Sequence, residues 1–153
     1  MKQIVQKCIL VFCFLNQPVY SQDKKLIFNH ISLDEGLPNV PINCITQDSY
    51  GYIWLGTTEG LFMYNGYNFT RYTYNDSTSI SGNYINAIIE DANKDILIGT
   101  NGRGFCIYNR ESEQFEGFSH RDDEPESIIN NTVKSIFQDS KGNIWIGTLG
   151  GGV

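Results

Sequence analysis

Short apolar strands alternate with polar turns through most of the chain after residue 22, and three segments repeat one another. Residues 42–57, 85–100 and 133–148 align without gaps. Each contains an apolar, β-prone stretch, a polar turn that begins with Asp, and a second apolar stretch that ends in Gly-Thr. This order predicts a strand, a hairpin turn and a second strand in every segment.

Each of the first two repeats continues beyond its Gly-Thr pair. A turn containing glycine leads to a predicted third strand, at residues 60–64 and 104–108, and a second turn leads to a predicted fourth strand, at residues 67–72 and 115–118. The aspartates that open the hairpin turns recur at intervals of 43 and 48 residues. Four short antiparallel strands at this period are one blade of a β-propeller. We therefore predict an all-β fold of four-stranded antiparallel blades.

The hairpin turn has the form Asp-x-x-Gly in the first and third repeats. Gly51 and Gly142 are expected to adopt a positive φ there, whereas the second repeat has Lys94 at this position. Because asparagine tolerates the left-handed conformation better than lysine does, we expect Asn93 to adopt it instead. The aspartates are expected to accept hydrogen bonds from backbone amides of their own turns.

The repeats predict an incomplete propeller. We expect a signal peptide at 1–21, an N-terminal segment at 22–38, blades at 39–76 and 82–121, and a truncated blade at 132–153. Within the N-terminal segment, Phe28 to Ile31 has the spacing of a fourth strand without the first three, which favours a strand that closes the ring by completing the last blade. A propeller typically has about 4 to 8 blades. The chain is therefore interpreted as truncated, with the remaining blades as its partners.

The first residues have the layout of a signal peptide. Lys2 and Lys7 precede the apolar run 8–15, and a polar stretch ends at Ser21, after which cleavage is expected. The apolar run is far shorter than the roughly 20 residues of a membrane-spanning helix. Phe12, just before Cys13, disfavours a lipid anchor. The mature segment is thus predicted to be exported.

Charge and cysteine content narrow the function further. The 153 residues carry a formal net charge of -6, and the clustered Lys and Arg that phosphate backbones require are lacking, so nucleic acid is excluded as a partner. Cys44 and Cys106 remain after cleavage, and export would permit a disulfide between them. Their positions on non-equivalent strands of different repeats favour two buried thiols, with the disulfide as the alternative.

Ligand candidates lie on the loops that join the fourth strand to the next first strand and the second strand to the third, because these loops share one propeller face. They are Asn39, Glu59, Asn83, Asn101, Arg103 and Asn131. Arg103 stands between Gly102 and Gly104, and its guanidinium is suited to a carboxylate or sulfate. The alternative is a solvated loop charge.

Other chemistry-bearing residues have structural interpretations. Trp54 and Trp145 suit sugar stacking, but their place in the second strand favours packing between blades. Residues 91–95 resemble the start of a calcium loop, yet the sixth and twelfth positions lack the required Gly and Glu, so no metal site is expected. His30 and His120 are remote from any nucleophile motif, and therefore neither catalytic residues nor a cofactor are expected.

The motif Asp-x-x-Gly-x-Ile-Trp-Ile/Leu-Gly-Thr occurs at 48–57 and 139–148. Together with residues 60–66 and 31–39, it resembles the two-component regulator propeller repeat, and the resemblance extends over residues 26–153. The second blade departs from the motif, with Lys94 for the turn glycine and Leu97 for the tryptophan.

The resemblance implies a sensor on the periplasmic side of the inner membrane, in a protein whose later modules often include a histidine kinase. Many such proteins sense glycans or their breakdown products. The segment itself would then be non-catalytic, bind a saccharide or another small solute, meet the membrane only through a downstream span, and belong to a protein able to form a homodimer. A secreted propeller lyase or hydrolase and a protein-binding scaffold are the alternatives.

Overall fold

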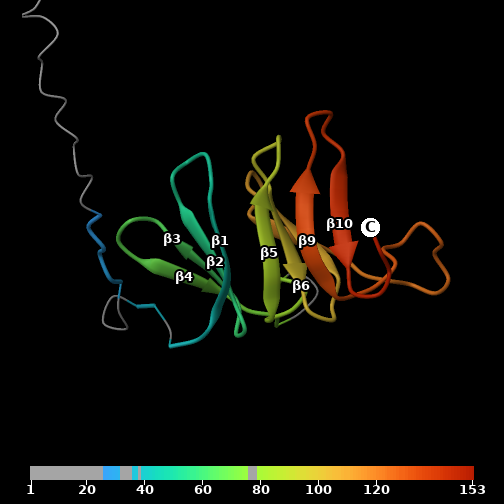
Figure 1. Ribbon diagram of the computed structural model, residues 1–153, viewed down its shortest axis with the longest axis horizontal. Helices are drawn as coiled ribbons and strands as arrows, with labels where there is room; N and C mark the ends of the chain where they lie inside the picture. The colour runs from blue at the N-terminus through green and yellow to red at the C-terminus, as the bar shows by residue number, and fades with distance from the viewer. Residues whose placement is uncertain (1–25, 32–35, 38, 76–78) are drawn as a thin grey trace, which may run out of the picture. The chain divides into compact units, whose positions relative to one another are not determined.

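The computed structural model describes residues 26–31, 36, 37, 39–75 and 79–153 (Figure 1). Residues 31–153 form one compact unit. All regular structure in the described residues is β-strand, in two four-stranded sheets and one two-stranded sheet, and every strand pair within them is antiparallel. The predicted all-β fold of four-stranded antiparallel blades is confirmed.

The sheets follow the sequence repeats in order. The first blade contains β1 (Ile42–Gln47), β2 (Ile53–Thr57), β3 (Leu61–Tyr64) and β4 (Phe69–Tyr72), and the second contains β5 (Ile85–Glu90), β6 (Ile96–Thr100), β7 (Phe105–Asn109) and β8 (Gln114–Phe118). The third sheet pairs β9 (Val133–Gln138) with β10 (Ile144–Thr148). Strands neighbouring in sequence also neighbour in each sheet, so short turns can connect them.

The first strands of adjacent blades, β1, β5 and β9, lie side by side. A bulged residue on β1 hydrogen-bonds to β5, and one on β5 hydrogen-bonds to β9. The pairing of β1 with β2 shifts between Ile42 and Cys44, and that of β5 with β6 shifts between Ile85 and Ala87. The bulged Asn43 donates its side-chain amide to the Ile85 carbonyl at 2.8 Å. Asn86 donates in the same way to the Val133 carbonyl at 2.7 Å. A bulge thus re-aims one polar side chain toward the next blade.

Apolar side chains fill the space between the first two blades. Trp54 is fully buried, with its ring 6.0 Å from that of Tyr72 and 5.7 Å from that of Tyr108. This confirms the packing interpretation of Trp54. Trp145, at the equivalent place on β10, is 52% exposed. In the second blade, the fully buried Leu97 occupies this position.

The hairpin turns differ from expectation at one residue. Lys94 itself adopts a φ of 74°, close to the 90° of Gly51 and 88° of Gly142, so the prediction that Asn93 takes the left-handed conformation is wrong. The turn is fixed by hydrogen bonds from the amides of Lys94 and Asp95 to Asp91, and these require the fourth turn residue to have a positive φ whatever its type.

The expected aspartate caps are confirmed. Asp48 Oδ1 accepts hydrogen bonds from the amides of Tyr50 and Tyr52, at 3.0 and 2.9 Å. Asp91 and Asp139 bind the corresponding amides of their own turns. Cys44 and Cys106 are free thiols, which favours the unpaired interpretation over a disulfide.

The predicted signal peptide at 1–21 lies outside the described residues. Residues 26–31 form no strand, and their large apolar side chains are exposed. The ring-closing strand and the domain boundaries therefore stay predictions. In the part of the chain that the structure describes, no helix is long and apolar enough to cross a membrane.

Candidate functional site

Loops from neighbouring blades meet on one face, at the end of the strands opposite the Asp-x-x-Gly hairpins. The Asn101 amide donates to the Tyr84 carbonyl at 2.8 Å, and Asn101 forms an isolated β-bridge with Thr132. The Leu149 amide donates to the Thr132 carbonyl at 2.9 Å. The β6–β7 loop is thereby fixed between the β4–β5 and β8–β9 loops.

A backbone clip shapes the loop that carries Arg103. The Asn131 carbonyl accepts hydrogen bonds from the Gly102 amide at 3.0 Å and the Gly104 amide at 2.7 Å. Both glycines have positive φ, 90° and 76°, a conformation that L side chains rarely adopt. The loop therefore bends around one carbonyl and presents the residue between the two glycines.

The Arg103 side chain is held on two sides. Its guanidinium carbon lies 4.3 Å from the centre of the Tyr74 ring, within cation–π distance. Its stem runs against Gly82, where an added Cβ would lie 3.1 Å from Arg103 Cδ. A hollow of about 500 Å³ lies beside this pair and is lined by Tyr74, Ser79, Ser81, Gly102, Arg103, Gly117, Phe118, Ser119 and Asn131.

Two of the predicted asparagines position this loop face. Asn83 Oδ1 accepts a hydrogen bond from the Tyr74 amide at 2.7 Å, and Asn131 Oδ1 accepts one from the His120 amide at 2.6 Å. Each asparagine thus fixes the chain that leaves the preceding fourth strand. Among the six predicted residues, Arg103 and Asn131 line the hollow, and Asn83 fixes the backbone of its Tyr74 wall.

The remaining predicted residues lie elsewhere. Glu59, in the first blade, is exposed and forms a 3.8 Å ion pair with Arg71, whose guanidinium also donates to the Glu59 carbonyl. Asn39 is exposed just before β1. Asn101 lies at the base of the clipped loop and outside the lining of the hollow. Ligand binding by these three residues stays a prediction.

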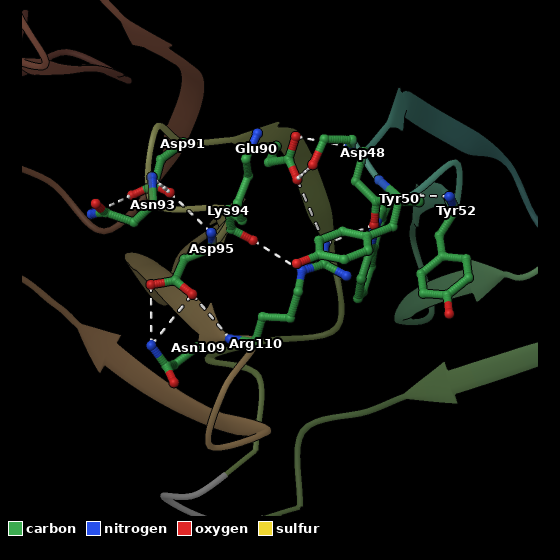
Figure 2. Close-up of polar contacts among 12 residues, drawn as sticks. Asp48, Tyr50, Tyr52, Glu90, Asp91, Asn93, Lys94, Asp95, Asn109 and Arg110 are labelled. Atoms are coloured by element: carbon green, nitrogen blue, oxygen red, sulfur yellow. Dashed lines mark hydrogen bonds and ion pairs between the residues drawn. The ribbon is translucent and has the colours of Figure 1, made fainter.

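A second polar cluster, missed by the sequence analysis, lies at the hairpin end of the first two blades. Figure 2 shows Arg110, which follows β7, reaching toward the hairpin turn of the first blade. Arg110 donates to Asp48 Oδ2 at 2.7 Å, and Trp54 donates to the same oxygen at 2.8 Å. The guanidinium also lies 4.5 Å from the centre of the Tyr50 ring. Arg110 is therefore bound to the first blade while its backbone belongs to the second.

The Asp48 side chain is fully buried, whereas that of Arg110 is 18% exposed. Burial acts to raise the pKa of Asp48, but the hydrogen bonds from Trp54 and Arg110 outweigh it, and the pKa lies below its usual value. Glu90 joins the cluster by accepting hydrogen bonds from the Ser49 amide and hydroxyl, each at 2.9 Å. These groups satisfy one another, so the cluster is a lock between blades.

The third blade repeats half of this lock. Asp139 accepts hydrogen bonds from Asn143 Nδ2 at 2.9 Å and from the Trp145 indole at 3.1 Å. These bonds lower the pKa of Asp139 to about 2.

The ionisable side chains of the described residues were expected to form no metal site. No group of three or more His, Cys, Asp or Glu side chains among them is arranged to hold a metal ion. His120 contacts the Ile128 carbonyl at 2.8 Å and Asp122 at 3.2 Å, both within its own loop. The loop face around Arg103, with its hollow and its fixed polar groups, is the candidate site.

Comparisons with known proteins agree with this geometry. The model of the two-component regulator propeller family matches residues 36–59, 79–102 and 127–150. Each match contains the first two strands of one sheet, so the family repeat recurs in step with the blades. Histidine kinase P4 of Formosa agariphila is 34% identical over 83 residues, which are 53% of this chain and 6% of the kinase.

Solved structures of similar proteins come from B. thetaiotaomicron. The extracellular domain of BT3049, described as a proposed hybrid two component system, superimposes with a TM-score of 0.72 at 29% identity, over 77% of this chain and 17% of that domain. The extracellular domain of BT4673 gives 0.59 at 27% identity, over 72% of this chain and 14% of that domain. The chain thus spans less than a fifth of each of these relatives.

Proposed function

Because this chain belongs to the two-component regulator propeller family, we propose that it is part of an extracytoplasmic sensor that binds a saccharide and controls a two-component signalling pathway. Histidine kinase P4 supports the signalling role, since the similarity includes more than half of this chain. The similar solved structures are extracellular domains, which supports a location outside the cytoplasm. Kinase activity would belong to another part of the full-length protein.

The observation that carries the proposal is the built loop face around Arg103. Small-ligand sites combine apolar or aromatic walls with a few fixed polar groups. Here the aromatic residues Tyr74 and Phe118, together with Ser119 and Arg103, line one hollow. Aromatic faces and hydrogen-bonding groups are what a sugar ring requires.

A ligand in this hollow would contact three separate loops at the same time. Tyr74 belongs to the β4–β5 loop, Arg103 to the β6–β7 loop and Asn131 to the β8–β9 loop. The β4–β5 and β8–β9 loops join the first blade to the second and the second to the third, whereas the β6–β7 loop joins two strands of the second blade. A saccharide that fits one arrangement of the loops better than another shifts their equilibrium, which is the signal that a sensor transmits.

A genetic experiment tests the proposed function. The source bacterium and a strain that lacks the gene are each grown with a panel of purified polysaccharides, and their transcripts are compared. We expect at least one saccharide to induce genes in the parent strain alone, and a restored gene to return the response. Identical transcript profiles in the two strains on every saccharide would contradict the proposal.

A further inference from the structure

The other three arginines of the chain each form an ion pair with an acidic side chain. Arg71 pairs with Glu59, Arg110 with Asp48 and Arg121 with Glu124. Among the residues that the structure describes, none forms an ion pair with Arg103. Its exposed guanidinium instead rests on the Tyr74 ring, beside an open hollow.

We propose that Arg103 binds the acidic group, a carboxylate or sulfate, of the saccharide that this propeller senses. The inference rests on the proposed function and adds the chemical class of the ligand. A planar guanidinium has five N–H donors in a fork that matches two oxygens of such a group. Stacking against Tyr74 covers one face of the fork and leaves its donor edges for the ligand.

The structure fixes Arg103 before any ligand arrives. The Asn131 carbonyl holds the amides on both sides of it, and Gly82 provides the space for its stem. The Thr100 hydroxyl donates to the Gly104 carbonyl at 2.7 Å, which closes the same loop from inside the blade. A group that is already ordered loses less conformational entropy on binding, so more of the interaction appears as affinity.

The charge of the chain limits the ligand further. The formal net charge of -6 repels a polyanion. At physiological ionic strength, however, salt screens the interaction between charges that are more than about 8 Å apart. A single acidic group in contact with Arg103 is affected mainly by that arginine. The ligand is therefore an oligosaccharide with one or a few acidic groups, such as a uronate-capped or singly sulfated sugar.

Two matched pairs of probes test the proposal by calorimetric titration of the full-length product of the natural open reading frame. The first pair is glucuronosyl-xylotriose and its methyl ester, and the second is lactose 6-sulfate and lactose. We expect the charged member of at least one pair to bind about tenfold or more tightly than its neutral partner, and higher salt to reduce the difference. The pair that shows the preference identifies the acidic group.

Variants then assign the preference to Arg103. Arg103→Gln should remove it, and Arg103→Lys should keep a smaller part, because lysine keeps the charge without the planar fork. Arg71→Gln is the matched control, since Arg71 also lies over a ring, Phe62 at 5.5 Å, but is paired with Glu59. The control should bind the charged probe as the parent protein does.

The outcomes separate this inference from the proposed function. Equal binding of charged and neutral probes, or an unchanged preference in Arg103→Gln, overturns the role of Arg103 while saccharide binding stands. Absence of binding by all four probes overturns the acidic ligand class. If the genetic experiment nevertheless finds an inducing saccharide, the sensor function survives that loss.

Discussion

Arg110 Nη2 lies 2.7 Å from Asp48 Oδ2, although the two residues belong to different blades. The contact joins the hairpin turn after β1 to the turn after β7, and the indole of Trp54 donates to the same aspartate oxygen. The described part of the propeller therefore has an ionic lock at one end of its first two blades and the Arg103 hollow at the other.

The lock should be a main contributor to the association of these blades. Arg110→Met keeps most of the aliphatic stem but leaves the buried Asp48 carboxylate without its ionic partner. We expect the free energy of unfolding of the full-length protein to fall by roughly 3 kcal/mol, the lower end of the range for breaking a buried pair. Chemical denaturation followed by tryptophan fluorescence measures it, because Trp54 contacts the same aspartate.

Arg121→Met is the control for this change. Arg121 pairs with Glu124 at 2.9 Å, but both side chains are about half exposed, so the loss should stay below about 1 kcal/mol. Equal effects of the two substitutions would show that Arg110 is an ordinary surface charge.

Most of the fold could be predicted because its signals are local. The alternation of apolar stretches with Asp-x-x-Gly turns predicted second strands that end in Gly-Thr, and β2 and β10 do end at Thr57 and Thr148. The lock could not be predicted in this way, since Arg110 and Asp48 are 62 residues apart and the turn that carries Arg110 looks like solvated loop. The one available signal was Arg110 itself, which stands where the first blade has Gly66.

The candidate site was predicted in part. The order of the strands predicted which propeller face carries the site. The flanking glycines, Gly102 and Gly104, singled out Arg103 on that face. Tyr74 was not among the predicted ligand candidates, although it lies two residues beyond β4 and stacks on Arg103. Lys94 shows where a rule based on residue type fails. Lysine disfavours a positive φ, yet the hydrogen bonds of the turn to Asp91 hold Lys94 in that conformation.

Acid should weaken the fold through its turn aspartates. The pKa of Asp139 is lowered to about 2 and that of Asp48 is also lowered, so both carboxylates stabilise the folded state above the unfolded-state pKa of about 4. That stabilisation is lost as the pH falls through the folded-state values. We expect urea denaturation midpoints to decrease between pH 5 and pH 2.

Asp139→Asn isolates one of these groups, because asparagine keeps the shape of the side chain and does not titrate. Its midpoint at pH 5 should lie below that of the parent protein, and the decrease down to pH 2 should be smaller. A variant that loses stability with acid as steeply as the parent would show that Asp139 contributes nothing to the pH dependence.

The glycine of the Gly-Thr signature is expected to set the distance between blades. A Cβ on Gly99 would lie 2.6 Å from Val133 Cγ1 on the first strand of the next blade. Gly99→Ala should therefore cost about 2 kcal/mol of stability through overpacking. Val133→Ala removes the opposing methyl groups, so the double variant should be more stable than the sum of the two single effects predicts. Strict additivity in thermal or chemical denaturation would argue against this close contact.

The two cysteines of the blades should be unreactive in the native protein. Burial raises the pKa of Cys44 to about 11 and also raises that of Cys106, so little thiolate is present at pH 8. We expect iodoacetamide to alkylate both residues only after denaturation, as measured by mass spectrometry of their peptides. Recovery of a peptide pair joined by a Cys44–Cys106 disulfide would contradict the free thiols of the structure.

Hydrogen–deuterium exchange of the full-length protein, with and without its inducing saccharide, tests the central claim most directly. If the propeller senses a saccharide at the Arg103 face, the amides of 79–84, 101–104 and 119–132 should gain protection in the parent protein and gain none in Arg103→Gln. The hairpin turns at 48–52 and 91–95 should be unchanged. Protection confined to those turns, or none in residues 39–153, would contradict the account.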